Sequence, residues 1–244
     1  MKPQIGIDQC RAFINCHMQP VPAHEEPATQ DRPPTITISR QSGAGGHSVA
    51  VRLAEILQAR APANTRPWTV FDRNLVDQVL EDHHLPKSLA RFLGEERRSE
   101  LQDTIDELVG LHPHSDALAR QVSETVLRLA DLGNTILIGR GATFITRKLP
   151  HTFHVRLVGS LDRRVERVAE CQHISRDAAR EMVRREDAAR RGYVRRFFGQ
   201  EVDDPLHYHL VLNTDWVPFE EAARVIATMV RAREGVRQEE CWAV

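Results

Sequence analysis

A glycine-rich turn between two periodic segments constrains the fold of this chain more than any other feature. Four β-branched residues, Thr35–Ile38, lead into the turn S-G-A-G-G-H-S at Ser42–Ser48, and apolar residues recur at helical spacing from Val49 onwards. Glycine lets consecutive backbone N–H groups point into one concavity, and a helix that starts there adds partial positive charge. The segment therefore predicts a strand, a phosphate-binding loop and a helix.

Further along the chain, short apolar runs alternate with helical patterns. The expected strands are Trp68–Phe71, Asn134–Ile138, Phe153–Val158 and His209–Leu212. The expected helices are Asn74–Glu81, Arg97–Val109, Asp116–Leu132, Leu161–Glu170, Ser175–Arg196 and Phe219–Arg233. Strands separated by helices imply a parallel sheet with right-handed crossovers, whose ligands bind beyond the carboxyl ends of the strands. We expect an N-terminal extension and linker over residues 1–33 and one α/β domain over residues 34–244.

Composition narrows the class of protein. The 244 residues are 41% hydrophobic, which is enough for one sizeable core, and the net charge of −1 gives no sign of a nucleic-acid or membrane-surface partner. The four cysteines are scattered without a pairing pattern, which suits a reducing compartment. No apolar stretch reaches transmembrane length, and the N-terminus has no continuous apolar run of the secretory kind. We therefore expect a cytoplasmic protein with no membrane partner.

The glycine-rich turn also supplies the first candidate site. We expect it to bind phosphates through the backbone of Ser42, Gly43, Ala44, Gly45, Gly46, His47 and Ser48. The hydroxyl of Ser48 occupies the position that ligates Mg²⁺ in P-loop enzymes. The lysine of the pattern G-x-x-x-x-G-K-[ST] is missing, because Gly46 and His47 stand in its place. Arg40, next to the loop, is a candidate for the missing charge. Each of these interpretations has an alternative. The glycines could simply permit a tight turn, Arg40 could be an ordinary surface arginine, and His47 and Ser48 could be solvated residues in the first turn of the helix.

The segment Ser175–Arg196 carries an unusual density of arginines at helical spacing. Four of its residues are candidate catalytic residues: Arg184, Asp187, Arg190 and Arg191. The three arginines could neutralise negative charge during phosphoryl transfer. One interpretation is a solvated helix with internal salt bridges to its acidic residues. The other is a lid over residues 175–200 that closes and brings arginines to the transferred group.

Four segments resemble the bacterial cytidylate kinases, in the same order and with similar spacing from Thr35 to the end of the chain. The turn S-G-A-G-G-H-S resembles their S-G-A-G-K-G-T loop, and I-L-I-G-R-G-A, which contains Arg140, resembles their strand-end G-R-D. R-R-E-D-A-A-R-R at Arg184–Arg191 resembles their arginine-rich lid, and Y-H-L-V-L-N-T-D at Tyr208–Asp215 resembles their last strand. The sequence I-S-R-x-x-G-x-G-G is typical of the cytidylate kinase-like family.

This resemblance implies a three-layer P-loop NTPase fold, with a parallel sheet flanked by helices and a helical arginine-rich lid. It implies ATP and Mg²⁺, with transfer of the γ-phosphate to a nucleoside monophosphate, CMP or dCMP first. Asp72, Arg73 and Arg140 would face this phosphate-bearing acceptor. From the residues alone, Asp72 is equally interpreted as a helix N-cap with Arg73 as its solvated neighbour, whereas an arginine between two glycines at a strand end is poorly explained by packing.

Three departures from the cytidylate kinases leave two other hypotheses open. Gly46 aligns with their loop lysine, Ile138 with the aspartate before G-R-D, and Gly141 with its final aspartate. One hypothesis is a nucleotide-binding regulatory module that has lost phosphoryl transfer. The other is a kinase for a small non-nucleotide metabolite, because the fold does not fix the acceptor. The histidines form no complete metal-binding set.

Overall fold

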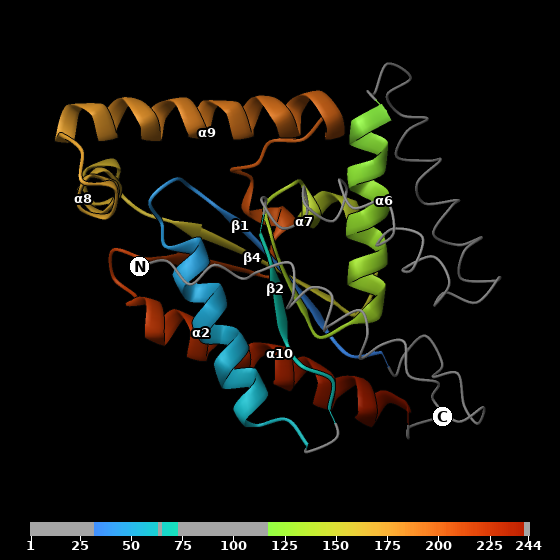
Figure 1. Ribbon diagram of the computed structural model, residues 1–244. Helices are drawn as coiled ribbons and strands as arrows, with labels where there is room; N and C mark the ends of the chain where they lie inside the picture. The colour runs from blue at the N-terminus through green and yellow to red at the C-terminus, as the bar shows by residue number, and fades with distance from the viewer. Residues whose placement is uncertain (1–31, 63–64, 73–116, 242–244) are drawn as a thin grey trace.

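A five-stranded parallel sheet forms the centre of the computed structural model, which describes residues 32–62, 65–72 and 117–241 (Figure 1). The strands are β1 (Thr35–Arg40), β2 (Thr69–Phe71), β3 (Thr135–Ile138), β4 (Thr152–Val158) and β5 (Leu210–Asn213). Their order across the sheet is β2-β3-β1-β4-β5, and every pair is parallel. The order places the first strand at the centre, so the turn that follows it opens at the middle of the carboxyl edge.

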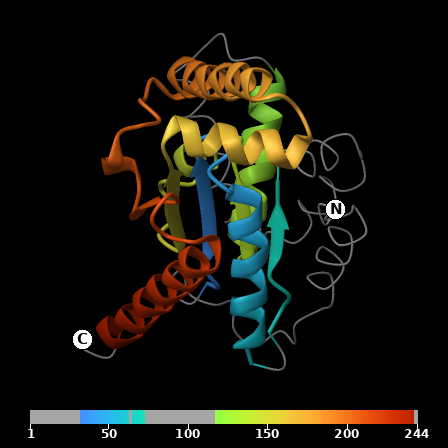
Figure 2. The ribbon, with the colours of Figure 1, turned by 90° about the vertical axis from the view of Figure 1, so that its left-hand side faces the viewer.

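Helices cover both faces of the sheet and its carboxyl edge. They are α2 (Gly46–Ala59), α6 (Ala117–Leu132), α7 (Ala142–Ile145), α8 (Leu161–Gln172), α9 (Arg176–Phe198) and α10 (Phe219–Cys241), with a 3₁₀ turn η1 at Pro205–His207. α2 and α10 pack against each other and against one face, and α6 and α7 lie on the other. In Figure 2, β1 and β2 point towards the end of the molecule that α8 and α9 cover.

The alternation of residues in β1 explains the two unlike faces of the sheet. Ile36 and Ile38 are fully buried in the apolar core beneath α2 and α10. Thr35 and Thr37 point the other way: the Thr35 hydroxyl donates to the Ala130 carbonyl of α6 at 2.8 Å, and the Thr37 hydroxyl lies 3.1 Å from that of Thr143. Side chains alternate between the two faces of a strand, so a T-I-T-I run gives one apolar face and one face whose hydroxyls form hydrogen bonds.

The structure confirms the expected strands and the expected helices within the described residues. α9 begins after Ser175, whose hydroxyl accepts from the Ala178 N–H at 3.2 Å as an N-cap. The short helix α7 was not expected, because four residues carry too little periodicity to be seen in the sequence. The helices expected over residues 74–81 and 97–109 lie outside the described residues. Within the residues that the structure describes, no helix is both long and apolar enough to span a membrane.

A stacked histidine pair occupies the polar side of the sheet. His154 of β4 is buried, its Nδ1 lies 2.8 Å from the Thr37 hydroxyl, and its ring stacks on that of His209. Burial, together with the nearby His209, Arg233 and Arg147, lowers the pKa of His154 to about 3. The imidazole is therefore neutral in the folded protein at any physiological pH.

We predict that this histidine makes the protein lose stability in mild acid. Because the folded pKa lies below the unfolded value, its contribution is complete above pH 6.5 and is lost as the pH falls towards 3. The free energy of unfolding should fall by up to ~1.4 kcal/mol per pH unit for this group. Urea unfolding between pH 7 and 5 should show a smaller slope for His154→Gln. The exposed His173→Asn variant should keep the wild-type slope, and a wild-type slope in His154→Gln would contradict the assignment.

Candidate functional site

The glycine-rich turn forms a tight loop at the carboxyl end of β1, as the sequence predicts. Gly43 and Gly45 have φ of 79° and 80°, the left-handed region that disfavours side chains. A Cβ on Gly43 would come 2.5 Å from the Arg164 carbonyl oxygen, and one on Gly45 would overlap the Phe219 ring. Gly45 is the N-cap of α2 and offers no side chain to that helix end. The loop therefore combines N–H groups of a helix start with close backbone packing, which is the geometry of an anion site.

Gly46 and Arg40 share the space in which the loop lysine would lie. A Cβ on Gly46 would come 3.0 Å from Cγ of Arg40, so the stem of Arg40 covers this position. The Arg40 guanidinium reaches Gly139, where a Cβ would overlap it. Arg40 thus brings a positive charge to the carboxyl edge across the place of the missing lysine, which supports its predicted role. Ser48 is exposed in the first turn of α2, beside His47.

Asp187 of α9 is bound directly to the loop. Its carboxylate accepts from the Ser42 backbone N–H at 2.7 Å and from the Arg164 guanidinium at 2.6 Å. Arg164, from α8, also donates to the carbonyl oxygens of Ser42 and Gly159, each at 2.9 Å. Asp187 and Arg164 are 8% and 6% exposed, so they form a buried ion pair whose two members also hydrogen-bond to the backbone. Arg164 was not predicted from the sequence as a site residue; it lies with Arg163 in the first turn of α8.

A second acid of α9 meets the same serine. The Glu186 carboxylate accepts from the Ser42 hydroxyl at 2.7 Å, and Arg190 donates to Glu186 at 2.8 Å and to Asp187 at 3.2 Å. Partial burial alone would raise the pKa of Glu186, but the Ser42 hydrogen bond and the charges of Arg190 and Arg40 outweigh it and lower that pKa. Glu186 is therefore ionised, and two negative charges stand over the loop.

A cavity of about 620 Å³ opens between the carboxyl edge and α9. Predicted site residues on its wall are Arg40, His47, Asp72, Arg140, Asp187, Arg190 and Arg191. The structure thus brings together residues from five separate segments. Arg184 lies on an exposed part of α9 and does not line this cavity. Arg73 lies outside the described residues, so its predicted role stays a prediction.

Arg140 reaches this cavity through an unusual backbone turn. Gly139, Arg140 and Gly141 have successive φ of 79°, 53° and 72°. A non-glycine residue in this region costs about 1 kcal/mol or more, and such strain gathers at functional sites. The two glycines also permit close packing, because a Cβ on Gly141 would come 2.6 Å from the Phe198 ring. The turn therefore explains physically why an arginine stands between glycines here.

Two other residues that line the cavity, Arg156 and Tyr193, were not predicted from the sequence. Arg156 of β4 donates to the Ser39 hydroxyl at 2.8 Å and forms an ion pair with Asp203. Tyr193 of α9 is mostly buried beside Arg140; burial raises the pKa of its hydroxyl, and the Arg140 charge only partly offsets the effect. The hydroxyl is therefore a neutral donor at physiological pH. The sequence offered a weak signal, since Arg156 is a charged residue inside an apolar strand.

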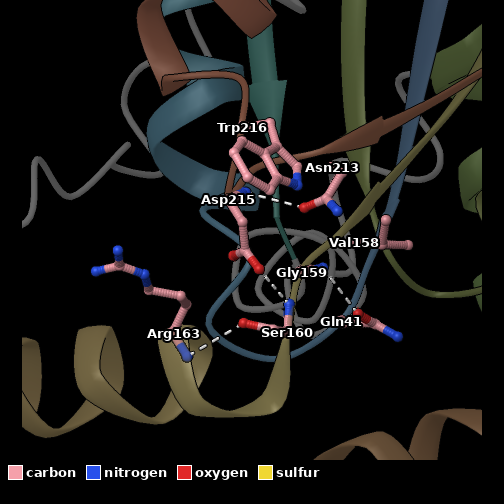
Figure 3. Close-up of a pocket in the computed structure, with 8 residues that line it drawn as sticks. All are labelled: Gln41, Val158, Gly159, Ser160, Arg163, Asn213, Asp215 and Trp216. Atoms are coloured by element: carbon pink, nitrogen blue, oxygen red, sulfur yellow. Dashed lines mark hydrogen bonds between the residues drawn. The ribbon is translucent and has the colours of Figure 1, made fainter.

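A separate groove of about 650 Å³ lies beside Gln41, directly before the loop (Figure 3). Its floor is fixed by hydrogen bonds from the Gly159 N–H to Gln41 at 3.0 Å and from the Ser160 N–H to Asp215 at 2.7 Å. At its rim stands Trp216, whose side chain is 85% exposed. Figure 3 shows the indole beside Asn213 and Asp215. A large exposed aromatic at a groove is typical of a surface that stacks on a flat ligand.

Gln41, directly before the glycine loop, lines both hollows, and His47 at the end of the loop lines the arginine-rich one. The arginine-rich cavity suits a second anion, and the groove suits a planar group. Among the residues that the structure describes, no cluster of three or more His, Cys, Asp or Glu side chains is placed to hold a metal ion.

Comparisons with known proteins point to one family. The sequence model of the cytidylate kinase-like family matches residues 35–216. A cytidylate kinase from Thermoplasma acidophilum is 27% identical over 120 residues, which cover 49% of this chain and 63% of that protein. The match thus spans less than two thirds of that relative's length.

Solved structures are similar in fold. The crystal structure of an uncharacterized protein from Eubacterium ventriosum has a TM-score of 0.64 at 20% identity, over 82% of this chain and 99% of that one. A shikimate kinase from Bacteroides thetaiotaomicron has a TM-score of 0.44 at 13% identity, over 81% of this chain and 98% of its own. The first of these likenesses, with the five-stranded parallel sheet, confirms the expected three-layer α/β fold, with a parallel sheet flanked by helices.

We predict that Gly45 is required for the loop itself and not only for helix α2. Gly45→Ala should cost more than ~2 kcal/mol, because it adds a clash with Phe219 to the left-handed strain. Gly199→Ala is the matched control, since Gly199 has φ of 61° but no atom near its absent Cβ, and should cost only ~1 kcal/mol. Urea unfolding measures both costs, and calorimetric ATP titration should show lost binding for Gly45→Ala alone. Equal losses in the two variants would contradict this role of the loop.

Proposed function

The chain belongs to the cytidylate kinase-like family, and we propose that it is an ATP-dependent phosphotransferase whose acceptor is a nucleoside monophosphate, CMP or dCMP first. The observation that carries the proposal is that Gln41, directly before the glycine loop, lines two hollows, one with an exposed aromatic ring and one rich in arginines. A phosphotransferase needs this order of parts, because the transferred group must lie between its donor and its acceptor.

The donor would lie along the loop. Backbone N–H groups of Ser42–Ser48 would bind its phosphates, and the groove of Figure 3 would take its base against Trp216. Mg²⁺ keeps several waters and needs only one or two protein oxygens besides the phosphates, so the Ser48 hydroxyl suffices as its ligand. The ion would neutralise charge on the phosphate oxygens.

The acceptor would lie in the cavity beneath α9. Arg140 would bind its phosphate, and Asp72 would contact the same end of the molecule. Tyr193 offers an aromatic wall and a neutral hydroxyl, while the Arg156–Asp203 pair offers both donors and acceptors for a polar base. A cavity of about 620 Å³ is large enough for a nucleoside monophosphate.

The chemistry would need no protein base. An oxygen of the acceptor phosphate attacks the γ-phosphorus, the bond to the bridging oxygen breaks, and ADP leaves. Negative charge spreads over the γ-phosphoryl oxygens in the transition state, and preorganised arginines stabilise it. Arg40, Arg190 and Arg191 line the cavity at the loop and would serve this purpose. Arg184 would join them only after α9 has moved as a lid.

A regulatory module remains the second candidate, and the absent loop lysine favours it. It would bind nucleotide at the same loop but transfer nothing, because Gly46, Ile138 and Gly141 lack the functional groups of the cytidylate kinases. A kinase for a small metabolite would share the donor site and differ only in the acceptor. The scattered cysteines support a reducing compartment, so we propose the cytoplasm as the place of action.

The deciding experiment is transfer of labelled γ-phosphate from ATP with Mg²⁺ to CMP, dCMP, UMP, AMP and GMP, with ATP binding measured on the same sample. We expect turnover with CMP or dCMP. Binding of ATP without transfer to any of the five would contradict the kinase proposal for these acceptors. It would favour the regulatory module, and a wider screen of hydroxyl acceptors would then separate that module from a metabolite kinase.

We predict that Arg140 acts on the acceptor rather than on the donor. Arg140→Ala should raise the KM for the acceptor at least about tenfold, because a charge-assisted bond to phosphate is lost, with little change in the KM for ATP. Steady-state kinetics with each substrate varied in turn measures both constants. Arg147→Ala, which removes an exposed arginine outside the cavity, is the control and should change neither. Equal rises in the KM values for the acceptor and for ATP would contradict a role of Arg140 that is specific to the acceptor.

We predict that Trp216 contributes stacking energy to the donor. Stacking of a base on an aromatic side chain is worth about 1 kcal/mol or more, so Trp216→Ala should weaken ATP binding at least about fivefold. The affinity for inorganic pyrophosphate, which has no base, should stay the same. Leu206→Ala removes another highly exposed apolar side chain and serves as the control. A parallel loss of pyrophosphate affinity would indicate damage to the loop instead of lost stacking.

A further inference from the structure

The Asp187 carboxylate occupies a position on the glycine loop that has the chemistry of a phosphate site. It accepts from one loop N–H, that of Ser42, and from the buried guanidinium of Arg164. We propose that Asp187 holds the place of a donor phosphate, and that Arg164 is the cation that binds this phosphate once Asp187 has left. The inference rests on the proposed function in one respect, which is that the loop binds a nucleotide.

The donors around Asp187 are of the kind that bind oxyanions. A loop N–H next to glycines in the left-handed region and a guanidinium on a helix are recurrent phosphate ligands. A carboxylate presents the same negatively charged oxygens, so it satisfies both donors in the absence of a nucleotide. The 2.7 Å and 2.6 Å hydrogen bonds have the lengths expected of charge-assisted bonds.

Arg164 is also bound to the loop by contacts that do not involve α9. Its Nε and Nη1 donate to the backbone carbonyls of Gly159 and Ser42, which belong to the start of α8 and to the loop. The guanidinium is thereby held at the loop and is 6% exposed. Removing its carboxylate without replacement would leave a buried unpaired charge, which is strongly unfavourable. Departure of Asp187 is therefore an exchange of one anion for another and not a simple opening.

The exchange would also release a second arginine. Arg190 donates to both Glu186 and Asp187, and Glu186 in turn accepts from the Ser42 hydroxyl. When both carboxylates leave the loop, Arg190 loses its fixed position and becomes available to the cavity that it lines. Arrival of a donor phosphate at Ser42 would therefore prepare the arginine side of the acceptor cavity. This couples donor binding to assembly of the transfer site.

Competition from Asp187 should weaken nucleotide binding in the wild-type protein. The apparent affinity is reduced by the fraction of molecules in which the loop is vacant. The arrangement assigns Asp187 an inhibitory role towards the donor, in contrast to a direct catalytic role. It also gives Arg164 a role that the sequence did not suggest, because it supplies a charge at the loop in addition to Arg40.

The test is calorimetric titration of ADP into the full-length protein and into Asp187→Asn. Asparagine keeps the shape but not the charge, so the variant should bind ADP at least about fivefold more tightly, within the range of allosteric couplings. Glu186→Gln should tighten binding in the same direction. Arg164→Gln should weaken it at least about tenfold. Asp162→Asn is the matched control, because Asp162 pairs with Arg180 in a partly exposed ion pair on the same two helices and its loss should leave ADP affinity unchanged.

A purely structural role for Asp187 predicts the opposite signs. In that case Asp187→Asn would lower both the stability and the ADP affinity, and this outcome would overturn the inference. If the place-holding role is right, the variant has a lower melting temperature without ligand but gains more from saturating ADP than the wild type does. Unchanged ADP affinity in Asp187→Asn would also overturn it.

The proposed function can fail separately from this inference. If the wild-type protein binds ADP but transfers no phosphate, only the kinase proposal is wrong. If the wild type binds no ADP, Asp187→Asn must gain binding of ADP or of inorganic pyrophosphate for the inference to stand. Absence of binding in every variant overturns the inference as well.

Discussion

The buried ion pair between Arg164 and Asp187 is the contact on which the candidate site depends. It joins three elements that are distant in the sequence: the loop after β1, the start of α8, and the middle of α9. A buried guanidinium and carboxylate tolerate no change in one partner unless the other is compensated. The pair therefore helps to hold α9 over the carboxyl edge, where residues of α9 line the arginine-rich cavity.

Charge balance follows from the same contact. The cavity beneath α9 is lined by five arginines: Arg40, Arg140, Arg156, Arg190 and Arg191. Such a concentration of like charge is unfavourable unless acids or a ligand neutralise it. In this structure Arg190 forms ion pairs with Glu186 and Asp187, and Arg156 forms an ion pair with Asp203. Ion pairs within the protein therefore neutralise part of the positive charge of this cavity, and an anionic ligand that replaced these carboxylates would preserve the charge balance.

Much of the fold and part of the candidate site were predictable from the sequence, because both follow from local periodicity. The alternation in Thr35–Ile38 marked the central strand, and the glycines after it marked the loop. Parallel topology then placed Arg140 on the same edge without knowledge of any contact. Arg164 and Trp216 were not predicted for a physical reason. The spacing of a residue in a helix or turn can be read from the sequence, but its neighbours in space depend on packing between distant segments. The roles of these site residues stay predictions until ligand binding is measured.

The missing loop lysine is best understood together with Arg40. A side chain at position 46 would meet the Arg40 stem, whose Cγ lies 3.0 Å from the place of a Cβ. The space beside Gly46 therefore has room for one long cationic side chain, from either the helix or the strand. In this chain it is the strand residue Arg40. Loss of the lysine and presence of the arginine are then two consequences of one packing constraint. Because Arg40 reaches past Gly46 to Gly139, its charge lies towards the arginine-rich cavity, while Arg164 holds a charge at Ser42. Two fixed arginines thus flank the loop that a lysine would otherwise cross.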